Sequence, residues 1–279
     1  MFKKLAMAAL LSAAYISGAQ AASAYVTNGG AAGVEATIAD SGAFDSSAAI
    51  GLRYKGVEFV NVDIRSSWYR FENGSSLIAQ YGANPFGATT WSTGGGMASA
   101  TFAFGGWTFT QLVTAVAPNK LSVHLDLTNN TGAAVRNAMW GVGFDPDQDG
   151  SGHNSTVNEI LGVGNAAAVR ATGVLNGYSV TLANDTSAGA SLIAGYVNAG
   201  DCCSAVDPAA AFAAAQSVGF SHVGDDSVSL AYQLGTIANG QTVSIGYSYI
   251  FAVPEPETYA LMLAGLGAVG FVARRRRQG

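Results

Sequence analysis

Hydrophobic and polar residues alternate along much of this chain with a period of two. In residues 121–128, which read LSVHLDLT, every odd position is aliphatic and every even position is polar. Residues 241–251 repeat the pattern, with large apolar residues at the odd positions from 243 and serine or glycine at 244, 246 and 248. Because successive side chains of a strand point to opposite faces, both segments are predicted to be antiparallel strands with one buried face.

Shorter segments of similar character run through residues 22–252, and Asn-Gly pairs at 73–74, 176–177 and 239–240 mark tight turns between them. The further predicted strands are 34–38, 48–54, 57–64, 67–71, 97–104, 107–116, 135–144, 167–171, 178–182, 191–197 and 227–234. This region shows no internal linker and is long enough to bury a core without disulfide staples. The pattern predicts one all-β domain with a β-sandwich or jelly-roll fold.

One segment departs from the strand pattern. Asp207 precedes Pro208 and a run of alanines that reaches Gln216. An acidic N-cap followed by proline at the first helical position is typical of a helix start. The sequence therefore predicts one short Ala-rich helix, which must pack against the sandwich to be stable.

The composition limits the class of protein. Of the 279 residues 49% are hydrophobic and 11% are charged, and the formal net charge is −5. Such a chain lacks the basic surface that nucleic-acid binding requires, and it is too apolar to be disordered. Residues 22–252 carry 16 acidic and 7 basic side chains, a net charge of −9, so the predicted domain is moderately acidic.

The N-terminus reads as an export signal. Lys3 and Lys4 precede an apolar stretch over residues 5–16, and the small residues Ala19 and Ala21 follow it. This order is typical of a signal peptide. We expect residues 1–21 to be removed by signal peptidase before Ala22, with a second acceptable site before Tyr25.

The C-terminus reads as a membrane anchor. Residues 259–273 are apolar throughout and end in Arg274, Arg275, Arg276 and Arg277. Fifteen helical residues rise about 22 Å, which is short for a hydrocarbon core of about 30 Å. The four arginines are expected to hold the end of this transmembrane helix in the cytoplasm, with the domain on the periplasmic side. A short helix of this kind suits a temporary anchor.

The segment from residue 253, VPEPETYALMLAGLGAVGFVARRRR, resembles the PEP-CTERM sorting signal of exopolysaccharide-producing Gram-negative bacteria. Pro254, Glu255 and Pro256 match the family's motif, and the four arginines match its basic tail. The resemblance implies that an exosortase removes the anchor in residues 253–279 at the inner membrane. It covers the C-terminal signal only, and it implies nothing about the fold of residues 22–252.

Three acids stand at alternate positions in one turn-rich segment. Asp145, Asp147 and Asp149, followed by Gly150, match the first half of a Ca²⁺-binding loop. The twelfth position of such a loop would be Thr156 in place of glutamate, and Glu159 is a candidate substitute. A structural Ca²⁺ site is one interpretation, and a solvated acidic turn is the other.

Cys202 and Cys203 are adjacent, and they are the chain's two cysteines. In an oxidising compartment they could form a vicinal disulfide, cross-link two chains or remain thiols. We favour a vicinal disulfide or a mixture of oxidation states over cross-linking between chains. A disulfide to another segment of the same chain is excluded.

Aromatic side chains provide the candidate glycan contact. Flat apolar rings suit the faces of sugars. Trp91 lies in the Gly-, Thr- and Ser-rich segment 87–96, so we expect it to be exposed and to be such a contact. Most other aromatic residues are expected in the core.

No catalytic motif is apparent in the sequence. His124, His153 and His222 are isolated from one another, and His124 is expected on a polar strand face. Neither HExxH nor GxSxG occurs. Glycoside hydrolysis needs a pair of acids, and no spacing selects a pair from Glu35, Glu58, Glu72, Asp126 and Glu159.

Together these features favour an exported protein of the cell surface or biofilm matrix. Its expected partners are signal peptidase, exosortase and exopolysaccharide, with Ca²⁺ as the candidate cofactor. The favoured role is a non-catalytic structural or binding component. The alternative is a secreted carbohydrate-active hydrolase.

Overall fold

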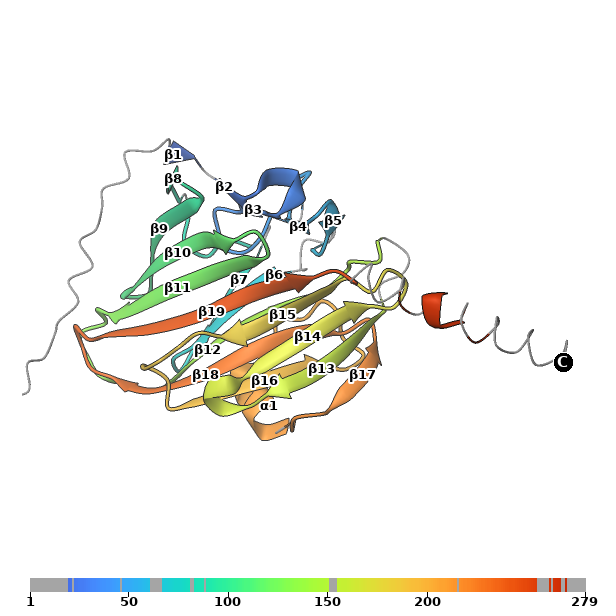
Figure 1. Cartoon of the computed structure of the whole chain (residues 1–279). Coiled ribbons are helices and arrows are strands. Elements are labelled where there is room, and N and C mark those ends of the chain that lie inside the picture. Colours follow the sequence, from blue (N-terminus) through green and yellow to red (C-terminus); the bar gives the residue numbers. More distant parts are fainter. Residues whose placement is uncertain are drawn as a thin grey trace, which may run out of the picture.

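The all-β prediction is confirmed by the computed structural model (Figure 1), in which strands account for most of the ordered elements. The structure describes residues 20–21, 23–45, 47–60, 67–80, 83–87, 89–150, 155–214, 216–254, 261, 263–266 and 269.

A ten-stranded antiparallel sheet forms one layer. Its order is β1–β8–β9–β10–β11–β19–β15–β14–β13–β17. The bounds are β1 Gln20–Ala21, β8 Trp91–Gly94, β9 Met97–Phe104, β10 Trp107–Ala117, β11 Lys120–Asn129, β19 Thr242–Ala252, β15 Ser179–Asn184, β14 Ala168–Gly173, β13 Thr156–Gly162 and β17 Ser221–Gly224. The C-terminal strand β19 lies at the centre, between β11 and β15.

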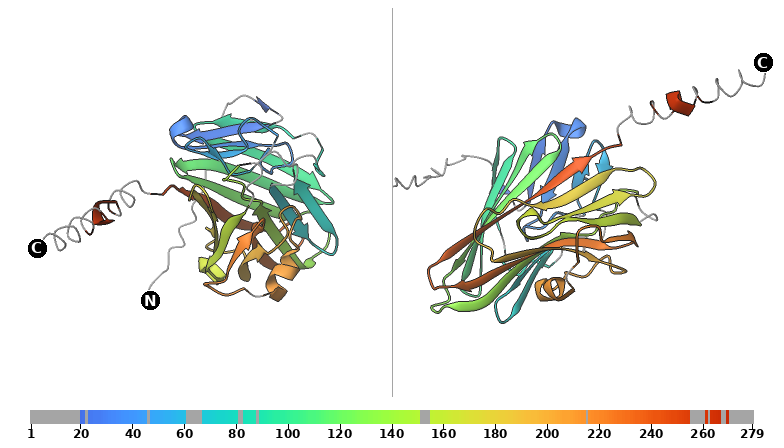
Figure 2. Two further views of the ribbon diagram at one scale, coloured as in Figure 1. Left: turned by 90° about the vertical axis from the view of Figure 1, so that its right-hand side faces the viewer. Right: turned by 60° about the horizontal axis from the view of Figure 1, so that its bottom comes forward.

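Two smaller sheets form the second layer. The five-stranded sheet has the order β16 (Leu192–Asn198), β18 (Ser227–Ile237), β12 (Val135–Phe144), β6 (Ser67–Glu72) and β7 (Ser76–Gln80). The four-stranded sheet has the order β2 (Ala24–Asn28), β3 (Val34–Ile38), β4 (Leu52–Tyr54) and β5 (Val57–Glu58). Short 3-10 turns occur at η1 (Gly30–Ala32) and η2 (Gly164–Ala166). Figure 2 shows the layers from two further directions.

The alternating apolar residues of the two layers meet in one core. Tyr249 of β19 contacts Phe44 and Phe144 edge-on, with ring centroids 5.0 and 5.5 Å apart. Phe71 of β6 likewise contacts Trp107 of β10 at 4.7 Å. Edge-to-face packing is favourable for aromatic rings beyond the burial of their area. The core therefore explains why large apolar residues occupy alternate positions of β10, β11 and β19.

Helix α1 (Pro208–Ala214) covers the outer face of the five-stranded sheet, as the Ala-rich segment predicts. Asp207 caps it, because its Oδ1 accepts a hydrogen bond of 2.8 Å from the Ala209 amide. Its Ala211 joins a second cluster of buried residues with Trp68, Val206 and Ala231. Two glycines of β12 make room for this packing: a Cβ on Gly141 would lie 3.0 Å from Pro208 Cγ, and one on Gly143 would lie 2.6 Å from Trp68 Cζ2.

Gly143→Ala is expected to lower the free energy of unfolding by about 1–3 kcal/mol, because overpacking forces neighbours to shift. The new methyl would also lie 2.8 Å from the Val228 carbonyl oxygen, which belongs to the backbone and cannot turn aside. The matched control is Gly246→Ala in β19, where the nearest atom would lie at an ordinary 3.6 Å. Urea unfolding of the two variants measures the difference. Equal midpoints would show that β12 and Trp68 leave room for a methyl group at residue 143.

Several strands fall outside the predicted ranges. β2, β7, β8, β13 and β17 were not predicted as strands. The predicted strand 48–54 is regular only over β4, and the described part of 57–64 is a strand only over β5. Of the expected signal peptide, residues 1–19 lie outside the described part of the chain, and Gln20–Ala21 form β1 against β8.

Candidate functional site

Three carboxylates converge where β12 ends and β18 begins. One oxygen each from Asp145, Asp147 and Asp225 lie within 4.8 Å of one another. Asp145 and Asp147 are buried, with 2% and 5% of their surfaces exposed. The pairing of β12 with β18 explains the convergence. Phe144, just before Asp145, pairs with Val228, three residues after Asp225.

Asp149 does not join this group. Its carboxylate accepts hydrogen bonds from the backbone amides of Leu175, at 2.8 Å, and Asn176, at 3.0 Å. It therefore holds the β14–β15 turn. The structure brings together two of the three expected ligands and adds Asp225, which the local spacing did not indicate.

Two other positions of the predicted loop are engaged elsewhere. Thr156 is 1% exposed, and its hydroxyl donates to Asn158 Oδ1 over 2.9 Å. Glu159, the candidate substitute for the last ligand, pairs instead with Arg170, whose Nη2 lies 2.6 Å from Glu159 Oε2. This interpretation of Glu159 was wrong, because its strand β13 directs the side chain toward β14.

A fourth acid adds negative charge beside the group. Asp226 is fully buried and accepts hydrogen bonds from the Gly200 amide at 2.7 Å and from Asn158 Nδ2 at 3.1 Å. His222 Nδ1 lies 2.7 Å from Asp226 Oδ2, the oxygen that also accepts from Asn158. Burial and the nearby Asp226 charge raise the pKa of Asp225. The group is thus a concentration of negative charge, and oxygen ligands of this kind suit a hard cation such as Ca²⁺.

The cysteine pair borders the same acids. Cys202 and Cys203 form a vicinal disulfide in the loop between β16 and α1, which is one of the states that we favoured from the sequence. Cys203 Sγ lies 3.8 Å from Asp145 Oδ2. Metal-binding sulfur is normally a thiolate, so in this oxidised state the carboxylates are the candidate ligands.

The expected exposure of Trp91 was wrong. Its side chain is 0% exposed, and its Nε1 donates a hydrogen bond of 3.1 Å to the Ala39 carbonyl oxygen. Residues 91–94 form strand β8, and the alternation of that strand directs Trp91 into the core and Ser92 outward. Trp91 therefore cannot stack on a sugar at the surface. The other tryptophans, Trp68, Trp107 and Trp140, are buried as expected.

The five acids considered for hydrolysis are each engaged separately. Burial raises the pKa of Glu58, but its carboxylate accepts bonds from the amides of Gly51 and Leu52, which fix a turn. The others pair with neighbouring side chains: Glu35 with Tyr25, Glu72 with Arg70, Asp126 with His124 and Ser244, and Glu159 with Arg170. His124 is exposed on the polar face of β11, as predicted.

The C-terminal segment is described only in part. Pro254 lies two residues beyond β19, whereas Glu255, Pro256, the four arginines and His153 lie outside the described residues. Residues 261, 263–266 and 269, within the predicted transmembrane stretch, are helical and exposed. Within the part of the chain that the structure describes, no helix has the length and apolarity needed to cross a bilayer.

A family model for the PEP-CTERM protein-sorting motif matches residues 252–277. The chain carries a PEP-CTERM sorting signal. This confirms the resemblance noted from the sequence and its restriction to the C-terminus. The signal marks an exported protein that is anchored in the membrane and then cleaved.

Other comparisons concern the fold alone. No curated protein matches the chain. A mutant of the heparan sulfate lyase HepC from Pedobacter heparinus is similar with a TM-score of 0.45 and 11% identity, over 80% of this chain and 34% of that one. A polysaccharide lyase is similar with a TM-score of 0.33 and 12% identity, over 68% of this chain and 26% of that one. The chain spans about a third or less of these structures, and similarity at this level says nothing about activity.

Proposed function

We propose that this chain is an exported protein that an exosortase releases from the inner membrane to the cell surface or extracellular matrix. There its β-sandwich acts as a non-catalytic structural or binding component of the exopolysaccharide. The observation that carries the proposal is the PEP-CTERM motif at residues 252–277.

The ends of the folded region suit this route. The last strand, β19, ends at Ala252, where the sorting motif begins, so cleavage beyond Pro254 leaves every described strand in place. At the other end, signal-peptidase cleavage before Ala22 removes the two residues of β1 but leaves β2 whole. Cleavage before Tyr25 would remove Ala24, which is 1% exposed and pairs with Ile38. The structure thus favours the first of the two predicted sites.

Ca²⁺ has a structural part in this proposal. Held by Asp145, Asp147 and Asp225, the ion would tie the end of β12 to the start of β18 and neutralise their mutual repulsion. It would stiffen the sandwich beside the vicinal disulfide without any catalytic step.

Cosedimentation tests the matrix role. The full chain, purified in mild detergent, is centrifuged with exopolysaccharide from its own host in the presence of Ca²⁺. We expect the chain to pellet in proportion to the polysaccharide added. An unrelated acidic exported protein serves as the control for trapping. Complete recovery of the chain in the supernatant would contradict the proposed association with exopolysaccharide.

A further inference from the structure

Part of the outer face of the ten-stranded sheet, over β9, β10, β11 and β19, carries pairs of short hydroxyl side chains. Thr101 of β9 bonds to Thr110 of β10 at 3.3 Å, and Thr128 of β11 bonds to Thr242 of β19 at 2.7 Å. Ser122 of β11 bonds at 2.9 Å to Ser248 of β19, which is itself fully buried. Cross-strand pairs of this kind hold their side chains in one arrangement. Figure 1 shows these strands side by side in one sheet.

A groove opens at the β8 end of this face. It is lined by Thr89, Thr90, Ser92, Ser99, Ala100 and Thr101 and has a volume of about 410 Å³. Five of these six residues carry a hydroxyl, and none of the six is charged. Ser92 pairs with Ser99 across β8 and β9, and Thr101 connects the groove to the hydroxyl pair with Thr110. The groove therefore continues into the Thr101–Thr110 pair.

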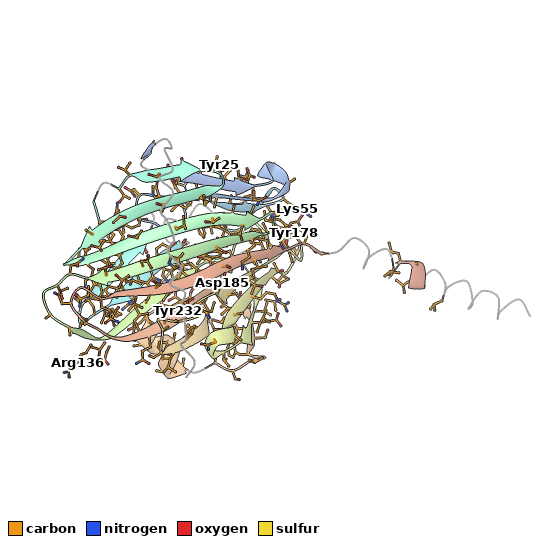
Figure 3. All side chains as sticks on the ribbon, turned by 60° about the vertical axis from the view of Figure 1, so that its left-hand side comes forward. Tyr25, Lys55, Arg136, Tyr178, Asp185 and Tyr232 are labelled. Carbon is orange, nitrogen blue, oxygen red and sulfur yellow. A yellow bond between two sulfur atoms is a disulfide. The ribbon has the colours of Figure 1, made fainter. Side chains whose placement is uncertain are left out.

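Charged groups on this face are engaged with each other. His124 Nε2 lies 3.1 Å from Asp126 Oδ1, which also accepts a bond from the Ser244 hydroxyl. Farther along, Lys120 pairs with Asp185 at 3.2 Å, and Asp185 is labelled in Figure 3. Protein surfaces are usually solvated by lysine, glutamate and other charged residues. The residues that line the groove are serine, threonine and alanine instead.

We propose that this groove, with the hydroxyl pairs beside it, binds one extended chain of an uncharged polysaccharide. A serine or threonine hydroxyl both donates and accepts a hydrogen bond, and so does each sugar hydroxyl. Ordered side chains on a rigid sheet reduce the entropy lost on binding. Pockets that hold small ligands commonly have volumes of about 300–1,000 Å³, and the groove lies in that range.

The charge of the domain selects the class of glycan. Residues 22–252 carry a net charge of −9, so a polyanionic glycan would be repelled at long range. None of the groove-lining residues offers a cation to a carboxylate or sulfate. The ligand is therefore a neutral polymer. This inference rests on the proposed function: it names the groove as the surface that binds the exopolysaccharide and an uncharged polymer as the class of ligand.

The test compares two variants of the full chain that lose similar groups from one sheet. The groove variant is Thr90→Val, Ser99→Ala and Thr101→Val. The matched control, Thr172→Val and Thr181→Val, lies on β14 and β15 of the same sheet. Valine keeps the branched shape that strands favour, and thermal unfolding followed by circular dichroism checks that both variants are folded.

Binding is measured by cosedimentation with the host exopolysaccharide, with soluble amylose and soluble alginate as neutral and anionic competitors. Loss of one neutral hydrogen bond costs a factor of about five in affinity, so the groove variant is expected to bind at least tenfold more weakly. The control variant should bind like the wild type, and amylose should compete while alginate does not.

Each outcome separates this inference from the proposed function. If the wild type pellets and a folded groove variant pellets equally well, the groove is not the binding surface, although the matrix role stands. Competition by alginate alone would overturn the neutral class of ligand. If the wild type itself stays in the supernatant, the proposed function fails, and this inference fails with it.

Discussion

Trp91→Ala is expected to lower the free energy of unfolding by about 3–5 kcal/mol, the usual cost of truncating a buried tryptophan. The side chain is fully buried, its ring meets Phe102 edge-on at 5.7 Å, and its Nε1–H bonds to the Ala39 carbonyl oxygen. The variant loses these contacts and leaves the Ala39 oxygen without its donor. For a domain of this size we expect the melting temperature to fall by about 10 °C.

Trp91→Phe is the matched control. It keeps an aromatic ring against Phe102 but loses the indole donor, so the loss of stability should be about 1–2 kcal/mol, from one hydrogen bond and a small change in volume. Urea unfolding and thermal melts measure both variants. An alanine variant as stable as the wild type would mean that Trp91 is exposed in solution, and would restore it as a candidate sugar contact.

The error over Trp91 shows where local pattern is a poor guide. Strands β11 and β19 were predicted within one or two residues, because long apolar–polar alternation has no other common explanation. β8 is only four residues long and lies in a segment rich in glycine, serine and threonine, so it was interpreted as a loop. Its burial comes from pairing with β9, which is a tertiary effect.

Sheet order was equally beyond local reasoning. β19 follows β18 in the chain but lies in the other layer, between β11 and β15. Nothing in the sequence of either strand specifies that exchange of layers. By contrast, the start of helix α1 was predicted correctly, because Asp207 and Pro208 fix it through contacts within a few residues.

The group of Asp145, Asp147 and Asp225 depends both on local spacing and on the pairing of distant strands. Asp145 and Asp147 were found from their spacing, but the spacing could not show that Asp149 turns toward the β14–β15 turn. Asp225 was missed because it joins the group only through the register of β12 against β18. A spacing rule describes one segment, whereas a site assembled by a sheet needs the pairing of distant strands.

Ca²⁺ is expected to raise the melting temperature of the full chain by about 5–10 °C. An ion at about 100 times its Kd stabilises the folded state by about 2.7 kcal/mol, and each kcal/mol is worth about 2–4 °C for a domain of this size. The stabilisation arises because Asp145, Asp147 and Asp225 gather negative charge within 4.8 Å, which the ion neutralises. Thermal melts in Ca²⁺ and in EDTA measure it. The shift should shrink as the pH falls, since protons then compete with the ion for the carboxylates, among them Asp225, whose pKa is raised by burial and by the Asp226 charge.

Two variants separate the site from the acidic segment as a whole. Asp225→Asn removes one of the three converging charges, so it should abolish most of the Ca²⁺-dependent shift. Asp149→Asn should lower the melting temperature in both solutions, because it weakens the bonds to the Leu175 and Asn176 amides, yet leave the shift between them intact. If Asp149→Asn abolishes the shift and Asp225→Asn preserves it, the ligands are Asp145, Asp147 and Asp149 instead. Identical wild-type melts in Ca²⁺ and EDTA would contradict the proposed ion site.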